Sequence, residues 1–211
     1  MRELFCTNVG SHIWKMNHKN SDIDLVSVYM MDSKNFLLGK QVRGKQKKDG
    51  DIDLVIYEIG HVIHHLLKGN CNFLWCVMSP IVVRKYRNAL NELREVVANN
   101  LAKNCYNSIN GLAKHNIYHY IEKGDRQSLL HKKKLNVIGR TLKFGINLLT
   151  WGKCMFQKVD IENEEELYLL KEQLNKAYMY STLPEKPNKE PFEKYLIRWR
   201  LKKMREDEMI E

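Results

Sequence analysis

The acidic residues of two short stretches constrain this chain more than any other feature. Asp22 and Asp24 alternate with apolar residues in the stretch SDIDLV at 21–26, and Asp53 lies in a second such stretch, DIDLVIY at 51–57. Successive side chains of a β-strand point to opposite faces, so Asp22 and Asp24 would share one face. If the second stretch is a neighbouring strand, Asp53 adds a third carboxylate, and such a cluster repels itself unless a cation neutralises it. The pattern therefore predicts a divalent metal site.

A possible phosphate site precedes these carboxylates. Residues 3–9 are predicted to form a strand that ends at Gly10, and Ser11 is predicted to open a short helix over 11–16. Free backbone N–H groups and the positive end of the dipole favour a phosphate at such a helix start, and glycine lets the backbone come close. We therefore expect phosphate and metal to meet at one place.

The order of these motifs resembles a known signature. Gly-Ser, a spacer, Asp-hydrophobic-Asp and a later strand Asp are similar to the DNA polymerase beta nucleotidyltransferase superfamily. Within it the chain looks closest to the RNA-ligase-associated predicted nucleotidyltransferases (RlaP-like), a likeness that covers roughly residues 5–200. Further matches follow in order: Lys68-Gly69-Asn70, SING at 108–111, Lys133 with Arg140, 145–152, and STLP at 181–184. Three positions depart from the family pattern: Lys15 replaces a usual Gly, Cys71 a Pro and Trp75 a frequent Glu.

The resemblance implies a metal-dependent enzyme that transfers an NMP from an NTP to an acceptor hydroxyl and releases pyrophosphate. Asp22 and Asp24 would hold Mg²⁺ (or Mn²⁺), and Asp53 would help to bind the ion that activates the attacking hydroxyl. Asp51 shares the face of Asp53 by alternation and is the alternative third carboxylate. The expected nucleotide-binding residues are Gly10, Ser11, Lys15, Lys133 and Arg140.

The charge of the chain bears on its partner. The net charge of +10 and the pI near 9.3 favour a polyanion, and lysines gather at 40–48 and 194–205. Lys45, Lys47 and Lys48 are therefore candidate nucleic-acid contacts, with RNA as the expected acceptor. A lysine-rich surface that only keeps the protein soluble is the simpler alternative. A protein or small-molecule acceptor, and a non-catalytic antitoxin-like module, are the other readings kept open.

Several classes of protein are disfavoured. No apolar run reaches the length of a membrane span, and the first residues do not resemble a signal peptide, so a cytoplasmic location is expected. The five cysteines are odd in number and include no Cys-x-x-Cys pair, which disfavours a disulfide framework or zinc ribbon. His61 and His65 have the spacing of zinc-binding helices, but the Glu of that motif and a third ligand are missing. These histidines are better interpreted as solvent-facing.

The predicted fold class is α+β. A small mixed β-sheet with flanking helices over residues 1–80 would form the catalytic core, with strands at 3–9, 22–30 and 51–58 and a mobile hairpin or loop at 31–50. Helical periodicity dominates afterwards. A helical domain is predicted over 81–182, followed by a Pro-containing linker and a basic C-terminal helix over 183–211 that docks on the body. The predicted helices cover 59–68, 82–104, 105–122, 129–150, 162–180 and 192–204.

Overall fold

A mixed β-sheet organises the first part of the chain. The computed structural model describes residues 1–40, 44–124 and 129–208, and in them the sheet has five strands in the order β3-β4-β2-β1-β5. β2 and β4 are parallel, and the other neighbouring strands are antiparallel. This arrangement confirms the predicted α+β class. The strands are β1 (Arg2–Asn8), β2 (Ile23–Met30), β3 (Lys45–Asp49), β4 (Ile52–Glu58) and β5 (Val82–Lys85).

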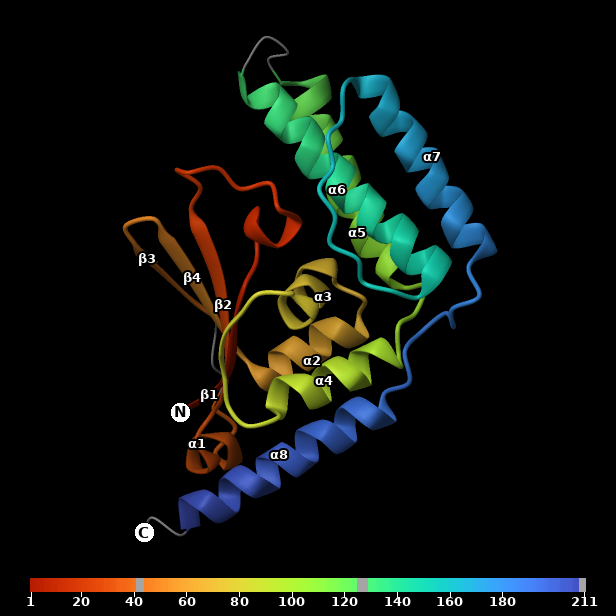
Figure 1. The fold of residues 1–211 in the computed structure, drawn as a ribbon. Coiled ribbons are helices and arrows are strands. Elements are labelled where there is room, and N and C mark those ends of the chain that lie inside the picture. The colour runs from red at the N-terminus through yellow and green to blue at the C-terminus, as the bar shows by residue number, and fades with distance from the viewer. Residues whose placement is uncertain (41–43, 125–128, 209–211) are drawn as a thin grey trace.

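The helices form two groups (Figure 1). Three of them lie beside the sheet: α2 (Ile59–Leu67), α3 (Cys71–Met78) and α4 (Ala89–Ala98). Three longer ones pack together away from it: α5 (Cys105–Ile117), α6 (Leu129–Trp151) and α7 (Glu164–Tyr180). α5 continues into a π-helical turn at Tyr118–Glu122. Two short helices, η1 (His12–Trp14) and α1 (Ser33–Leu37), lie within the connections of the sheet.

The sheet and its covering helices share one hydrophobic core. Alternation places Val26, Val28 and Met30 of β2 on the face that α2 covers, and all three are buried. α2 contributes Ile59, Val62, Ile63 and Leu66, which recur at helical spacing and form one apolar face. Glu58 caps this helix by accepting a hydrogen bond from the N–H of Gly60 at 2.6 Å.

One predicted element was wrong, and another is now defined more closely. Residues 82–85, expected at the start of a long helix, form edge strand β5, which pairs with β1, and the helix begins only at Ala89. The branched residues from Ile81 to Val83 suit an extended edge strand better than a helix start. Residues 45–49, expected in a mobile hairpin or loop, form edge strand β3, which pairs with β4 as an antiparallel hairpin. Positions 41–43 of that expected loop lie outside the described residues. The division into units 1–80, 81–182 and 183–211 stays a prediction, and β5 extends the sheet slightly beyond position 80.

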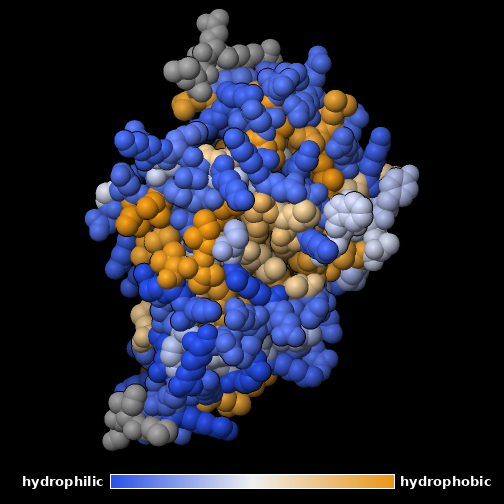
Figure 2. Space-filling model, viewed as in Figure 1, coloured by the Kyte–Doolittle hydropathy of each residue, from blue (hydrophilic) through white to orange (hydrophobic). Residues whose placement is uncertain are grey.

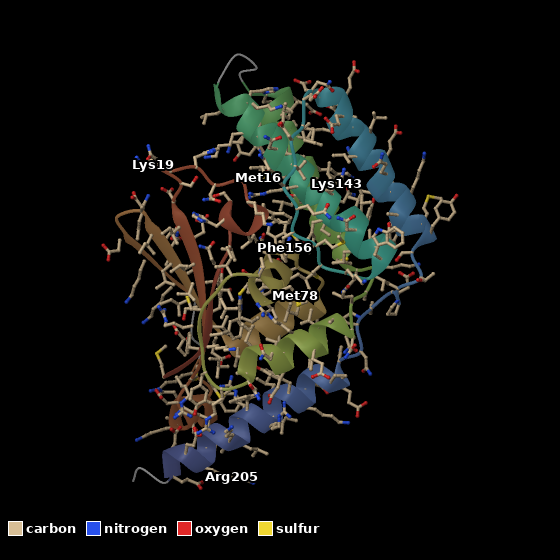
Figure 3. All side chains as sticks on the ribbon, viewed as in Figure 1. Met16, Lys19, Met78, Lys143, Phe156 and Arg205 are labelled. Carbon is tan, nitrogen blue, oxygen red and sulfur yellow. The ribbon has the colours of Figure 1, made fainter. Side chains whose placement is uncertain are left out.

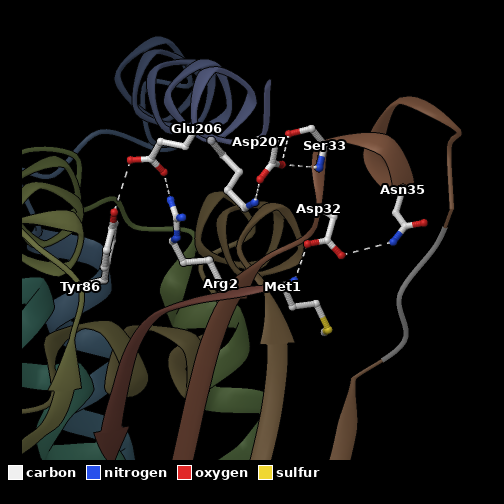
Figure 4. Close-up of polar contacts among 9 residues, drawn as sticks. Met1, Arg2, Asp32, Ser33, Asn35, Tyr86, Glu206 and Asp207 are labelled. Carbon is white, nitrogen blue, oxygen red and sulfur yellow. Dashed lines mark hydrogen bonds and ion pairs between the residues drawn. The ribbon is translucent and has the colours of Figure 1, made fainter. Parts of the chain in front are cut away.

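The C-terminal helix α8 (Glu190–Glu208) docks on the body, as expected. Phe192, Tyr195 and Trp199 are buried, and the Tyr195 hydroxyl donates to the carbonyl of Ala89 at 3.0 Å. The end of the helix is held to the start of the chain (Figure 4): Glu206 pairs with Arg2, and Asp207 accepts from the Ser33 hydroxyl at 2.6 Å. The helix thereby ties together segments that are distant in sequence.

The sheet face opposite the helices is partly open. Apolar side chains gather over the strands at the left of the molecule, among hydrophilic ones (Figure 2). Ile23 and Ile52 are cross-strand neighbours at the end of this face and are exposed. In the part of the chain that the structure describes, no helix is both long and apolar enough to cross a membrane.

Candidate active site

Strand register brings two of the predicted carboxylates together. Asp24 of β2 is the direct parallel partner of Asp53 of β4. Neighbouring strands lie about 4.8 Å apart, so both side chains leave adjacent positions on one face of the sheet. Asp22 lies directly before β2 and is exposed. Asp51 lies just before β4, where its carbonyl accepts from the N–H of Ile23 at 2.8 Å. Of the two candidates for the third carboxylate, Asp53 is therefore the one in register with Asp24.

The environment of Asp24 disfavours its charged form. Partial burial and the charges of Asp53 and Asp22 raise the pKa of the Asp24 carboxyl, and the positive charges of Arg140 and His12 oppose this shift. Asp53 accepts hydrogen bonds from Nε2 of Gln46 at both carboxylate oxygens, at 3.0 and 2.9 Å. Because like charges crowd Asp24, a cation placed here would relieve their repulsion.

Gly10 lies in direct contact with Asp24. Its backbone has a φ of +69°, and an ideal Cβ at this position would lie only 1.8 Å from Oδ2 of Asp24. The neighbouring N–H of Val9 donates to the Asp24 carbonyl at 2.8 Å. Only glycine satisfies both the left-handed backbone and this close approach. Ser11 follows at the start of η1, which is a single three-residue 3₁₀ turn rather than the longer helix predicted over 11–16.

Arg140 reaches the same place from α6. The side chain is half-buried, and desolvation lowers the pKa of its guanidinium to about 10, against the opposing effect of Asp24. Nε of Arg140 is itself buried and has no hydrogen-bond partner among the residues that the structure describes. The guanidinium carbon lies 5.5 Å from the centre of the Trp14 ring. A fixed positive charge with a spare donor therefore lies beside the carboxylates.

An aromatic cluster beneath the site connects the sheet part to α6. Trp14 of η1 contacts Trp75 of α3, Phe144 of α6 and Phe156, with ring centres 5.6, 5.9 and 4.9 Å away. Figure 3 shows Phe156 in the region between α3 and α6. Trp14 thus packs as core, and the cluster fixes the Gly10 loop relative to Arg140.

Two cavities adjoin Asp24. The larger, about 660 Å³, is lined by most of the predicted nucleotide-binding and metal-binding residues: Gly10, Ser11, Lys15, Asp22, Asp24, Lys133 and Arg140. The smaller, about 340 Å³, is lined by Asp24, Asp53 and the aromatic residues Tyr57, Phe73 and Trp75, among others. Gly10, Asp24 and Arg140 line both cavities. Asp24 therefore stands at their boundary.

The three predicted nucleic-acid lysines do not stay together. Lys48 is the cross-strand partner of Asp53 and shares its face of the sheet. Lys45 and Lys47 pair with Ile56 and Leu54, which alternate to the opposite face. All three are exposed. Of this set, only Lys48 lies on the carboxylate side.

Sequence reasoning missed Gln46, which holds Asp53. The signal was the alternation of β3, since recognition of this strand would have placed Gln46 on the face of Asp53. It also missed Lys158 and Asn136, which line the larger cavity. These residues lie far apart in sequence, and no local motif connects them to the site.

Comparison with known proteins identifies the family. Residues 1–180 match RlaP, described as the RNA repair pathway DNA polymerase beta family. The chain belongs to the RlaP family. It is accordingly a polymerase beta-like nucleotidyltransferase. No curated protein matches the sequence. Among solved structures, a nucleotidyltransferase-like protein from Exiguobacterium sibiricum 255-15 is similar at 9% identity and a TM-score of 0.32, over 84% of this chain and 69% of that one.

The structure shows the surroundings of the three positions at which this chain departs from the RlaP family pattern. Lys15 has a φ of 56°, a left-handed conformation that glycine adopts without cost. Cys71 is the first residue of α3, where proline is ordinarily acceptable, and its N–H donates to the Ser108 hydroxyl at 3.1 Å. Trp75 belongs to the aromatic cluster, and its buried indole N–H has no hydrogen-bond partner in the described part of the chain.

RlaP family membership implies NTP and divalent metal as substrate and cofactor. Within the described ranges, no three His, Cys, Asp or Glu side chains are grouped closely enough to hold a metal ion. The donor chemistry nevertheless fits, because carboxylate oxygens are the ligands that Mg²⁺ prefers and Asp24 is crowded by like charge. The zinc alternative at His61 and His65 gains no third ligand among these residues.

Proposed function

We propose that this protein transfers an NMP from an NTP to a terminal hydroxyl of RNA, with release of pyrophosphate. The observation that carries the proposal is the position of Asp24, in register with Asp53 and at the boundary of two cavities. A two-substrate transfer needs such a boundary, because donor and acceptor must meet at the reacting phosphorus.

The larger cavity is the proposed NTP site. Its volume of about 660 Å³ lies in the range of small-molecule sites. Lys15, Lys133 and Arg140 supply positive charge around it, and Gly10 and Ser11 supply a close backbone approach and a hydroxyl. This combination suits a triphosphate, which carries several negative charges and many acceptor oxygens.

Asp22, Asp24 and Asp53 are the proposed ligands of the divalent metal. Because the three carboxylates are not grouped closely enough in the described residues, binding would draw Asp22 toward the in-register pair of Asp24 and Asp53. When bound, Mg²⁺ would supply charge neutralisation for the transferring phosphoryl group and would lower the pKa of the attacking hydroxyl. Gln46 would keep Asp53 oriented through hydrogen bonds to both carboxylate oxygens. Asp53 could still bind the metal, because each of these oxygens retains a second lone pair.

Side chains held in fixed positions would assist the transfer itself. In the transfer, the acceptor hydroxyl loses its proton to solvent and its oxygen forms a bond to the α-phosphorus. The bond from that phosphorus to the bridging oxygen breaks, and pyrophosphate leaves with the electron pair. Arg140 is held in place by burial and by Trp14, so its charge needs little reorganisation to stabilise the negative charge of the phosphates. The aromatic cluster beneath would exclude water from one side of the site.

The choice of RNA rests on two supports. The family description refers to an RNA repair pathway, and the net charge of +10 favours a polyanionic partner. A protein or small-molecule acceptor would need less basic surface. The same transfer to those acceptors is therefore the second candidate.

The test is a labelling experiment. The protein is incubated with each α-labelled NTP and Mg²⁺ or Mn²⁺, in separate reactions with single-stranded RNA bearing a free 3′ hydroxyl, the same RNA with a blocked 3′ end, and a protein mixture. We expect label on the free-ended RNA and not on the blocked RNA. Label on protein alone would establish the second candidate, and no label on any acceptor would contradict the proposal.

A further inference from the structure

Four rings pack against one another where β4, α2 and α3 meet. Tyr57 of β4 stacks on His61 of α2 with ring centres 5.4 Å apart and planes 11° apart, and His65 stacks on Phe73 of α3 at 4.7 Å and 10°. The two stacked pairs contact each other at an angle: His61 lies 4.4 Å from His65 and Tyr57 lies 5.0 Å from Phe73, each with planes 55° apart. We name Tyr57, His61, His65 and Phe73 the histidine stack. Its two imidazoles have the i, i+4 spacing that places side chains on one face of a helix.

The histidine stack begins at the acceptor side of the site. Tyr57 and Phe73 line the smaller cavity together with Asp24 and Asp53. Tyr57 and Asp53 share one face of β4 by alternation, four residues or about 13 Å apart. Phe73 is buried, Tyr57 and His65 are half-buried, and His61 is exposed. The ring cluster therefore borders the cavity of the carboxylates on one side and reaches solvent at His61.

Core packing does not explain the exposed histidine at 61. The apolar residues of α2 that pack in the core are Ile59, Val62, Ile63 and Leu66, whereas His61 and His64 are exposed and His65 is half-buried against Phe73. Burial, together with electrostatic repulsion from His61, His64 and Lys68, lowers the pKa of His65 and so favours its neutral ring. A neutral ring serves as a stacking surface, and Lys68, close to the imidazoles, is a cation available for a phosphate.

We propose that the histidine stack binds the single-stranded end of the acceptor RNA, whose unpaired bases pack against the solvent-exposed surfaces of His61 and His65 while the terminal nucleotide occupies the smaller cavity beside Asp53. This inference rests on the proposed function, because it takes RNA as the acceptor. Unpaired bases stack on aromatic and histidine rings in a sequence-tolerant way, whereas the bases of a duplex are already stacked on one another. The stack therefore selects a single-stranded end and not a particular sequence.

The test compares His61→Ala/His65→Ala with His61→Phe/His65→Phe in the full-length protein. The probe is a fluorescent single-stranded RNA oligonucleotide with a free 3′ hydroxyl, and its affinity is measured by anisotropy without NTP. The alanine pair should bind at least roughly 5-fold more weakly for each ring in contact with a base, and the phenylalanine pair should keep wild-type affinity within about 2-fold. The matched control is His115→Ala/His119→Ala, which removes another contacting i, i+4 histidine pair, with ring centres 4.3 Å apart, from α5 and the turn after it.

The inference is overturned if the alanine pair binds this RNA like the wild type, if the phenylalanine pair loses as much affinity as the alanine pair, or if the control pair loses as much. Affinity for a nucleotide is measured on the same variants with a fluorescent ATP analogue and should not change. Failure here is distinct from failure of the proposed function, because the latter is decided by NMP transfer in the wild type. A wild type that labels protein but has no affinity for RNA would overturn the RNA acceptor and this inference together, and would leave nucleotidyl transfer standing.

Discussion

A methyl group on Gly10 would lie 1.8 Å from Oδ2 of Asp24, well inside any van der Waals contact. Gly10→Ala should therefore displace the Asp24 carboxylate and abolish NMP transfer, and it should destabilise the fold by about 2 kcal/mol or more through strain and clash. The measurements are a transfer assay and urea unfolding.

The control for that variant is Gly50→Ala. Gly50 also has a positive φ, 53°, but an added Cβ would meet nothing within 4 Å. It should lose only about 1 kcal/mol and keep full activity. Equal activity in the two variants would show that the contact of Gly10 with Asp24 does not matter for transfer.

Two substitutions of Lys15 should separate an effect on fold stability from an effect on NTP binding. Its φ of 56° is unfavourable for a residue with a Cβ, so Lys15→Gly should stabilise the fold by about 0.5–1 kcal/mol. The same change removes a charge from the proposed NTP cavity and should raise the KM for NTP. Lys15→Ala is the matched variant, since it removes the charge but keeps the Cβ that makes the left-handed backbone unfavourable. In this variant the KM for NTP should rise with no gain in unfolding free energy. An unchanged KM in both variants would remove Lys15 from the nucleotide site.

The buried ion pair between Arg200 of α8 and Glu58 of β4 should dominate the docking of the C-terminal helix. Both side chains are about 10% exposed. Arg200→Met leaves the Glu58 charge buried without its partner and should cost about 3–5 kcal/mol in unfolding free energy. Adding Glu58→Gln to this variant should restore part of the loss.

The comparison for the buried pair is Arg198, whose ion pair with Glu92 is largely exposed. Arg198→Met should cost no more than about 1 kcal/mol. Similar losses for the Arg198 and Arg200 variants would mean that the buried pair adds nothing particular to docking.

Asp207 should make the docking of α8 sensitive to acid. Hydrogen bonds from Lys203 and Ser33 lower the pKa of the Asp207 carboxyl from 3.8 to about 2. A depressed pKa stabilises the fold above the unfolded value, and this contribution is lost as the pH falls from about 4 through about 2. The difference in unfolding free energy between the wild type and Asp207→Asn should therefore be present at neutral pH and disappear across that range. Because Asp207 is partly open to solvent, which screens its charge, we expect less than about 1 kcal/mol.

Ser33→Ala checks the cause of this shift, because it removes one of the two side-chain donors to Asp207. In that background the acid-sensitive difference should shrink. A difference that is constant between pH 5 and pH 2 would contradict the assignment.

The sequence predicted the meeting of Asp24 and Asp53 because alternation and spacing are local properties of strands, and the parallel register of β2 and β4 confirms it. The roles of these residues stay predictions. Helix α8 was equally predictable, since Phe192, Tyr195 and Trp199 recur at helical spacing.

Other features depend on tertiary pairing that a local pattern does not contain. Val82–Lys85 is a strand only because β1 offers it an edge. The separation of Lys48 from Lys45 and Lys47 depends on the register of the β3–β4 ladder, which the expectation of a hairpin or loop does not specify. The histidine stack needs β4, α2 and α3 to meet. The four aromatic residues are visible in the sequence, but no local pattern predicts that they contact one another.

The most direct test of the central claim is NMP transfer by Asp24→Asn beside Asp51→Asn. Both changes remove one carboxylate charge with little change in shape, but only Asp24 is in register with Asp53 and lies between the two cavities. With α-labelled NTP, Mg²⁺ and single-stranded RNA, Asp24→Asn should lose transfer by a factor of about 1,000 or more, while Asp51→Asn should keep wild-type activity within about 3-fold. Wild-type transfer by a folded Asp24→Asn protein would contradict the account.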